Sequence, residues 1–459
     1  MEEAYKINPL LVRKYNQPVS KYSSYPTLPF WDKMLTSADW FANFKKEFNN
    51  NNHKEGISIY IHLPFCESLC NHCGWNNKIT TDHDVEEEYL LAIEKEWKLY
   101  KNGMQQTPVI REIHIGGGTP TFFSPKNLQR LLTMILKKSI VHPVYEFSIE
   151  AHPNNTTHKH LEVLYAHGFR NITFGVQDND PEVQRIINRI QPFDNLQKAT
   201  QMAREAGFTS IGFELMYGLP KQTIKGLQNT IEQVTTLLPE RIAYISYNHV
   251  PWINQSQQVF DKKDLPSAEE KISMYLPGRE MLMNLGYFDI GMDHFALEKD
   301  SLYKAWQKGR LHRNFTGYSA QYTGILVGLG VSAISDTGTA LAQNTKSLPD
   351  YYSSLNNNQL AIKKGYILND EDILFRKNIT AICCKGKTSF NESQTSLLEQ
   401  YTFPALDLFV LDGLITYNKE GLEVTRQGHF FIRNICSAFD MHLQKNKNIS
   451  DKDLFSKAI

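Results

Sequence analysis

Three cysteines lie within eight residues of one another, in the stretch HLPFCESLCNHCGWN. Cys66, Cys70 and Cys73 follow the spacing Cys-x3-Cys-x2-Cys. Thiolates bind zinc or iron–sulfur clusters. A structural zinc ion needs four ligands, and His72 could complete such a set. An iron–sulfur cluster held by three cysteines leaves one iron open for another ligand. The spacing alone leaves both interpretations open.

Further residues suited to ligand binding follow at intervals along the chain. They are Gly116 to Pro120 (GGGTP), Glu150, Gln177, Glu214 and Asn248 with His249. Glycines let the backbone approach a ligand closely, and carboxylates or amides can bind its polar groups. Taken singly, the glycines could form only a tight turn, and a buried glutamine could satisfy only backbone groups.

Each of these groups stands at the end of a short, apolar, β-rich segment. The six segments begin at Ile57, Val109, Tyr145, Asn171, Ser210 and Arg241. Helical periodicity fills much of the sequence between them, at residues 85–100, 127–138, 195–208 and 227–238. This alternation indicates an α/β fold with a parallel sheet. Barrel enzymes assemble their active sites at the carboxyl ends of such strands, so we expect a partial (β/α)6 barrel.

The sequence divides into three predicted parts. Residues 1–50 lack a strong secondary-structure signal and are expected to form a lid over the barrel, and the asparagine-rich residues 49–53 read as a surface loop. Residues 51–355 form the predicted catalytic domain with its extension. Residues 356–459 show helical patterns at 369–384, 403–414 and 426–444 and a hairpin pattern at 414–425. They predict a mainly helical, winged-helix-like domain.

The composition limits the classes of function that the sequence supports. Among 459 residues, 49 basic side chains balance 49 acidic ones, so the charge gives no support to nucleic-acid binding. No apolar run approaches the roughly 20 residues that span a bilayer, and the first residues lack a signal-peptide pattern. We therefore expect a cytoplasmic protein. In a reducing compartment the clustered cysteines indicate metal or redox chemistry, whereas Cys383, Cys384 and Cys436 read as small apolar residues on helices.

The cysteine spacing in the first strand–helix loop, with a glycine-rich strand end after it, resembles the radical S-adenosylmethionine (SAM) superfamily. The resemblance implies a 4Fe–4S cluster whose open iron binds SAM and whose electron cleaves it to a 5′-deoxyadenosyl radical. The segments YNQPVSKYSSYPT, LMYGLPKQT, GMDHFA and LHRNFTGY narrow the resemblance to oxygen-independent coproporphyrinogen III oxidases, from about residue 10 to the last helix. That family's reaction is oxidative decarboxylation of two propionates of a tetrapyrrole to vinyl groups.

The resemblance also implies roles for individual residues. Cys66, Cys70 and Cys73 would ligate the cluster. A first SAM would contact Tyr60, Gly117, Glu150 and Ile334, and a possible second SAM would contact His72, Gly118, Thr119, Gln177, Arg189, Glu214 and Asn248. The four propionates of the substrate need polar or cationic partners, for which Lys21, Tyr22, His312 and Arg313 are candidates. A reductant such as flavodoxin or ferredoxin and a monomeric state are also expected.

Several positions differ from the family pattern. Trp75 stands where the family has a cysteine that is not a cluster ligand. Lys21 replaces an arginine, and His72, Glu214 and Asn248 replace an aromatic residue, an aspartate and an alanine. Two alternative functions therefore accompany the leading one. One is a radical SAM paralogue acting on another tetrapyrrole, such as a haem-opening methylase, and the other is a non-catalytic protein that binds or delivers haem.

Overall fold

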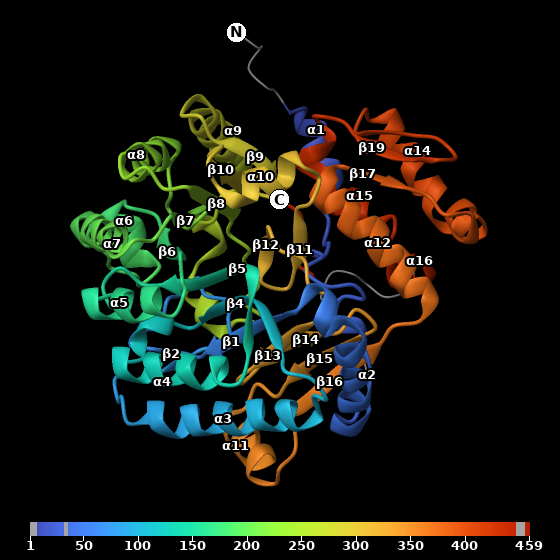
Figure 1. Ribbon diagram of the computed structural model, residues 1–459. Helices are drawn as coiled ribbons and strands as arrows, with labels where there is room; N and C mark the ends of the chain where they lie inside the picture. The colour runs from blue at the N-terminus through green and yellow to red at the C-terminus, as the bar shows by residue number, and fades with distance from the viewer. Residues whose placement is uncertain (1–6, 32–34, 447–454) are drawn as a thin grey trace.

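A curved twelve-stranded sheet forms the centre of the molecule (Figure 1). The computed structural model describes residues 7–31, 35–446 and 455–459. The strand order is β16-β15-β14-β13-β1-β4-β5-β6-β7-β8-β10-β9. Its middle consists of β1 (Ile57–Leu63), β4 (Val109–Gly117), β5 (Ile140–Ala151), β6 (Asn171–Gln177), β7 (Ser210–Tyr217) and β8 (Arg241–Ser246). These six strands pair in parallel in chain order, which confirms the predicted partial barrel.

Shorter strands extend the sheet at both edges. On one side β13 (Leu326–Leu329) pairs in parallel with β1 and is followed by the antiparallel strands β14 (Ile334–Asp336), β15 (Ala340–Asn344) and β16 (Ile362–Ile367). On the other side β10 (His294–Ala296) and β9 (Phe288–Gly291) add an antiparallel hairpin to β8. The sequence did not predict these strands, because segments this short carry little periodicity.

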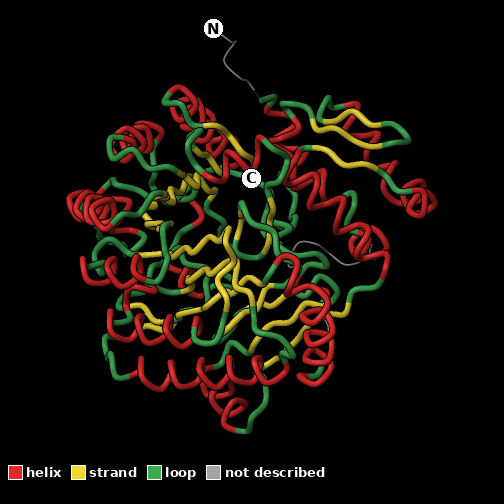
Figure 2. Tube along the Cα trace, viewed as in Figure 1, coloured by secondary structure: helices red, strands yellow, loops and turns green. Residues whose placement is uncertain are grey.

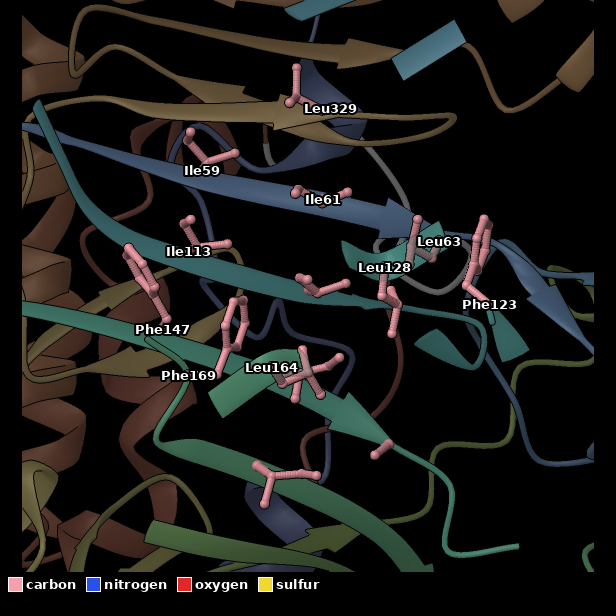
Figure 3. Packing of buried hydrophobic residues seen from close by; sticks show 14 of the residues in the cluster. Ile59, Ile61, Leu63, Ile113, Phe123, Leu128, Phe147, Leu164, Phe169 and Leu329 are labelled. Carbon is pink, nitrogen blue, oxygen red and sulfur yellow. The ribbon is translucent and has the colours of Figure 1, made fainter. Parts of the chain in front are cut away.

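Helices cover the outer face of the sheet, as Figure 2 shows. They are α3 (Val85–Gly103), α4 (Pro125–Leu136), α5 (His158–Ala166), α6 (Pro181–Ile186), α7 (Phe193–Ala206) and α8 (Ile224–Thr235). The outward strand residues Ile59, Ile113 and Phe147 are buried against this layer together with Leu128 and Leu164 (Figure 3). The sheet and its helices therefore share one apolar core outside the barrel.

The inner face of the same strands is polar. Because side chains alternate along a strand, Tyr60, His114, Ser148 and Glu214 lie on the face opposite these apolar residues. His114 lies opposite Ser148 in the sheet, and its Nδ1 is 2.8 Å from the serine Oγ. The fold thus directs polar groups from successive strands into the barrel.

The N-terminal segment contains more regular structure than the sequence predicted. It forms α1 (Pro9–Tyr15) and the long helix α2 (Ser37–Glu55). A capping box between Thr36 and Asp39 begins α2, and Trp40, Phe44 and Phe48 bury one face at helical spacing. The expected loop at residues 49–53 is therefore wrong, and the predicted boundary at residue 50 falls inside α2. The polar run NNNNH made the end of this amphipathic helix look like a loop in the sequence.

The C-terminal unit is mainly helical, with a small sheet. Its helices include α12 (Asp370–Lys385), α13 (Thr395–Leu397), α14 (Phe403–Leu411), α15 (Ile432–Ser437) and α16 (Met441–Lys445), and β17 (Lys387–Ser389), β18 (Ile415–Tyr417) and β19 (Gly421–Val424) form the sheet. The predicted hairpin is β18–β19. The helix expected over 426–444 is interrupted, because α15 ends at Ser437 and Asp440 caps the new helix α16 by accepting from the backbone N–H of Leu443. Residues 362–367, placed in the C-terminal domain by the sequence, pair with β15 in the main sheet.

Further helices and strands lie in the loops of the barrel and its extension. They are β2 (Phe65–Cys66), β3 (Lys78–Ile79), α9 (Ala268–Asn284), α10 (Ser301–Gln307), β11 (His312–Asn314), β12 (Gly317–Ser319) and α11 (Leu348–Asn356). Helix α1 packs against the C-terminal unit, where the ring of Tyr15 lies 5.3 Å from those of Phe409 and Phe431 (Figure 1). Within the described ranges, no helix is long and apolar enough to cross a membrane.

Candidate active site

A cavity of about 670 Å³ lies at the carboxyl ends of the parallel strands. Most of the site residues predicted from the sequence line it, although they come from segments far apart in the chain. Those residues are Lys21, Cys66, Cys70, His72, Cys73, Gly117, Gly118, Thr119, Glu150, Gln177, Arg189, Glu214 and Asn248. The residues predicted from the strand ends therefore lie together in one cavity.

The cysteine loop is held against the end of α6. Asn71 donates from its backbone N–H to the carbonyl of Ile187 at 2.9 Å, and Asn188 donates from Nδ2 to the carbonyl of Leu69 at 2.7 Å. On the other side, Gln257 Nε2 donates to the carbonyl of His72 at 3.3 Å. These bonds fix a loop that has little regular structure of its own.

Each of the three sulfur atoms receives a side-chain donor. Thr119 Oγ1 lies 3.4 Å from the Sγ of Cys66. Arg189 Nη1 lies 3.7 Å from the Sγ of Cys70, and Asn77 Nδ2 lies 3.4 Å from the Sγ of Cys73.

Burial raises the pKa of the Cys66 thiol and raises that of Cys73 to about 11. Without a bound cation these two groups are therefore neutral thiols at neutral pH. Donors aimed at all three sulfurs stabilise the thiolate form that a metal cluster requires. The donor set fits a 4Fe–4S cluster.

The glycine run passes close beneath the cysteine loop. Gly117 has a φ of +118°, which strains any other residue. A Cβ on Gly118 would lie 2.5 Å from the carbonyl oxygen of Pro64 and 2.9 Å from the Sγ of Cys66. The glycines therefore do more than turn the chain, because only they allow the loop to approach the strand end this closely.

Two carboxylates face the cavity from neighbouring parts of the sheet. Glu150 accepts from the backbone N–H of Gly117 at 3.4 Å and lies 3.4 Å from Nε2 of His114. Burial, followed by the charge of Glu150, raises the pKa of Glu214 to about 7. Burial alone would lower the pKa of His114, but its hydrogen bond to Glu150 and the nearby carboxylates raise it overall. Glu214 therefore exchanges a proton near neutral pH, and carboxylates in this part of the cavity can bind an ammonium group.

Polar atoms without partners remain in the wall of the cavity. Arg189 donates through Nη2 to the carbonyl of Gly175 at 2.6 Å, but its Nε has no hydrogen-bond partner among the described residues. The Nδ1 of His72 is likewise buried without a partner in that part of the chain. Burial, with the charge of Arg189, lowers the pKa of His72 to about 3, so this imidazole is neutral. Unsatisfied buried groups indicate a polar ligand. Arg189 therefore lines the cavity as the family resemblance implies.

Some predicted residues lie outside the cavity wall. Tyr60 is buried beneath it, with its hydroxyl 2.9 Å from Nδ1 of His62, and Ile334 is buried in β14. Tyr22 is buried against the C-terminal unit and donates to Asp440 at 3.2 Å. His312 and Arg313 belong to the β11–β12 hairpin and do not line the cavity.

Trp75 lies at the edge of the cavity. Its side chain is 49% exposed and lines the cavity wall. The ring of Phe315 stands perpendicular to it at 6.1 Å, and Phe315 in turn contacts the ring of Tyr60 at 6.0 Å. Trp75 therefore offers an aromatic surface beside the cysteine loop.

Several residues of the site escaped prediction. Asn77 and His114 contact predicted residues directly, and Val19, Ser20 and Phe455 form part of the cavity wall. His114 could have been predicted, because it lies two residues before Gly116 on the inner face of β4.

Among the residues that the structure describes, no group of three His, Cys, Asp or Glu side chains is arranged to hold a single metal ion.

Comparison with known proteins relates this arrangement to a family. The model of the Radical SAM superfamily matches residues 60–234. The oxygen-independent coproporphyrinogen III oxidase of Helicobacter pylori is 34% identical over 96% of this chain and 98% of its own length. Proteins of the same name from Synechocystis sp. and Escherichia coli K12 are each 35% identical over 98% of this chain and cover 97% and 98% of their own lengths.

The chain belongs to the oxygen-independent coproporphyrinogen III oxidase family. A solved structure of coproporphyrinogen III oxidase from Escherichia coli, described as a radical SAM enzyme, superposes with a TM-score of 0.86 at 33% identity. It covers 96% of this chain and the whole of that chain. The resemblance and the fold predicted from the sequence are both confirmed. The family implies a 4Fe–4S cluster and SAM, which agrees with the three thiols and the unpartnered polar atoms of the cavity.

Proposed function

We propose that this protein is a radical SAM enzyme that converts coproporphyrinogen III to protoporphyrinogen IX. The reaction is the oxidative decarboxylation of two propionate side chains to vinyl groups. The observation that carries the proposal is one cavity lined by three loop cysteines and by polar side chains from the parallel strands β5, β6, β7 and β8. The chain also matches proteins named for this activity over nearly its whole length.

The residues of the cavity divide into two proposed groups. Cys66, Cys70 and Cys73 would hold the cluster, with Thr119, Arg189 and Asn77 stabilising their negative charge. When bound, the cluster and SAM supply hydrogen-atom abstraction from an unactivated carbon.

The polar wall would orient SAM. Glu150, held by Gly117 and His114, can accept from an ammonium or a ribose hydroxyl. Arg189 keeps a free N–H that can bind a carboxylate. Gln177, Glu214, Asn248 and His72 also line the cavity, and a second SAM would contact them at the positions that the family resemblance assigns. Tyr60 and Ile334 would act from beneath the wall, by supporting the strand ends.

The proposal extends to partners and location. The cysteine loop is exposed at residues 67–69, which leaves a one-electron carrier such as flavodoxin or ferredoxin a direct approach to the cluster. We further propose a monomer that works in the cytoplasm, where the clustered cysteines would stay reduced.

Anaerobic turnover tests the proposal. The protein is reconstituted with iron and sulfide, reduced, and incubated with SAM and coproporphyrinogen III, and the products are separated after oxidation to porphyrins. Protoporphyrin with release of carbon dioxide is the expected result. Binding of one zinc ion and no iron after anaerobic reconstitution would overturn every radical interpretation.

Trp75 favours a second candidate, a radical SAM enzyme that acts on another tetrapyrrole. An indole at the cavity edge gives a flat macrocycle a surface for stacking. Methylated or ring-opened haem in a parallel incubation with haem would support this candidate. Tight haem binding without SAM cleavage would instead indicate a haem-binding protein.

A further inference from the structure

The first half of β5 extends beyond one of its neighbouring strands. Its first residues pair with β4, but β6 joins β5 only from Ser148 onward. Residues 140–146 therefore form no ladder with β6. They lie at the amino end of β5, whereas the main cavity lies at the carboxyl ends of the parallel strands. This strand end is thus remote from the proposed chemistry.

The side chains of this strand end are apolar and exposed. Ile140 is 53% exposed and Val144 is 58% exposed, and Val141 and Tyr145 are exposed as well. Apolar strand ends without cover promote association in water. Pro143 opposes pairing with a further strand, because it has no N–H to donate. The exposed side chains therefore favour a partner that does not add a strand to the sheet.

The loop that follows α5 continues this surface. A Cβ on Gly168 would lie 3.2 Å from the ring of Tyr145, so the loop packs against the strand. The guanidinium carbon of Arg170 lies 3.6 Å from the centre of the exposed ring of Tyr165. Arg170 donates to the carbonyls of Tyr165 and Phe169 and forms no ion pair within the described ranges, so no carboxylate neutralises its charge there.

Lysines at the carboxyl ends of α3 and α4 border the same surface. Lys137 and Lys138 directly precede β5. Burial, followed by the charge of Lys138, lowers the pKa of Lys101, and the charges of Lys98 and Lys137 act in the same direction. Lys98 pairs with Glu94 at 3.0 Å, but the other three lysines form no ion pair with a described residue. Cations gathered in this way attract an anionic partner.

The charge at this end of the barrel differs from the balance of the whole chain. Residues 101–110, 137–145 and 165–171, at the amino ends of β4, β5 and β6, contain four lysine or arginine residues and no aspartate or glutamate. The complete sequence contains equal numbers of basic and acidic residues. The positive charge is therefore a local property of the surface around the exposed strand end.

We propose that this surface binds an anionic lipid bilayer. We call it the basal patch, and it consists of the apolar residues Ile140, Val141, Val144, Tyr145 and Tyr165 and the cations Lys101, Lys137, Lys138 and Arg170. The apolar side chains enter the boundary between headgroups and acyl chains, and the cations contact the lipid phosphates. This docking leaves the carboxyl ends of the strands free, and it goes beyond the proposed reaction without depending on it.

Sedimentation with lipid vesicles tests the assignment without turnover. The full chain with its reconstituted cluster is mixed with vesicles of phosphatidylcholine alone, or of phosphatidylcholine with about one third phosphatidylglycerol, and the bound fraction is measured at rising lipid concentration. We expect binding to the anionic vesicles and none to the neutral ones. Added salt should weaken the binding, because it screens surface charges.

Two changes separate the parts of the basal patch. Lys137→Gln together with Lys138→Gln removes two cations and should weaken binding to the anionic vesicles roughly tenfold to thirtyfold, the effect of losing two charges at the membrane surface. Val144→Asp places a charge in the apolar part and should weaken binding at least about tenfold. Circular dichroism checks that both variants are folded.

The controls make the same chemical changes on the outer helices. Lys198→Gln together with Lys225→Gln removes two exposed cations from α7 and α8, and Ile224→Asp charges an exposed apolar position of α8. Both should leave vesicle binding unchanged.

Four results would overturn the inference. The wild-type protein could fail to bind the anionic vesicles, or bind neutral and anionic vesicles equally. The control variants could lose as much affinity as the variants of the basal patch. Finally, a dimer detected by sedimentation velocity and lost in Val144→Asp, without vesicle binding, would assign the basal patch to a second copy of the chain.

Discussion

The molecule contains two sets of three cysteines in opposite surroundings. Cys66, Cys70 and Cys73 lie on a loop in the cavity wall, and each sulfur receives a side-chain donor. Cys383, Cys384 and Cys436 lie on α12 and α15, buried in the apolar core of the C-terminal unit.

In the second set, the Sγ atoms of Cys383 and Cys436 are 3.5 Å apart, and burial raises the pKa of Cys384 to about 12. Burial also raises the pKa of Cys436, and the three side chains are packed like other small apolar side chains. In the first set, the surrounding N–H and O–H groups favour the charged thiolate. Both sets contain three cysteines, and the hydrogen-bond donors around the sulfur atoms make the difference between them.

The largest expected effect separates the two sets directly. Cys66→Ser, Cys70→Ser and Cys73→Ser should each abolish the iron–sulfur absorbance after reconstitution, together with SAM cleavage, because each removes one of three proposed ligands. Cys384→Ser should keep both. Iron and sulfide content, visible absorbance and release of 5′-deoxyadenosine are the measurements.

Circular dichroism is the control for this experiment, because the loop variants should remain folded. A full cluster in Cys73→Ser, or its loss in Cys384→Ser, would contradict the division between the two sets.

The free energy of unfolding should depend more on the buried cysteines of the C-terminal unit than on the cysteines of the cavity wall. Cys436→Ser places a hydroxyl where the side chain is fully buried among apolar groups, and it should lower the free energy of unfolding by about 1–3 kcal/mol. Cys73→Ser changes a side chain in the cavity wall and should cost much less in the cluster-free protein. Urea unfolding of the cluster-free proteins measures both. Equal losses in the two variants would show that both sets serve packing.

The two regions also differ in how far the sequence predicted them. The six parallel strands and the polar groups at their ends were predictable, since strand alternation and strand order place those groups at one edge. The short edge strands were not, and α2 was concealed because asparagines interrupt its apolar face.

Within the site, local patterns identified the cysteines and glycines but not Asn77, whose role depends on how the loop folds back toward Cys73. The small pocket lined by Lys21, Asp293 and Arg433 was beyond prediction, because these residues come from separate segments of the chain and no periodicity connects them. Likewise, the resemblance suggested His312 and Arg313 as partners for the substrate, whereas the structure keeps them out of the cavity wall.

The smallest predicted effect concerns Trp75, which shares its loop with the three cavity cysteines. Its ring is half-exposed and has one described aromatic neighbour, Phe315, so Trp75→Ala should change the free energy of unfolding by less than about 0.5 kcal/mol. Loss of an aromatic contact is worth about 0.5–1.5 kcal/mol, so binding of coproporphyrin III should weaken roughly two- to tenfold.

Trp306→Ala is the matched control for this variant, because Trp306 is also partly exposed but lies on α10, and it should leave porphyrin binding unchanged. Trp75→Ala should weaken binding of coproporphyrin III and of its uncharged tetramethyl ester alike, because stacking does not depend on charge. Unchanged porphyrin affinity in Trp75→Ala would mean that the indole only closes the cavity edge. The departure from the family's cysteine would then concern the shape of the entrance and not recognition of the macrocycle.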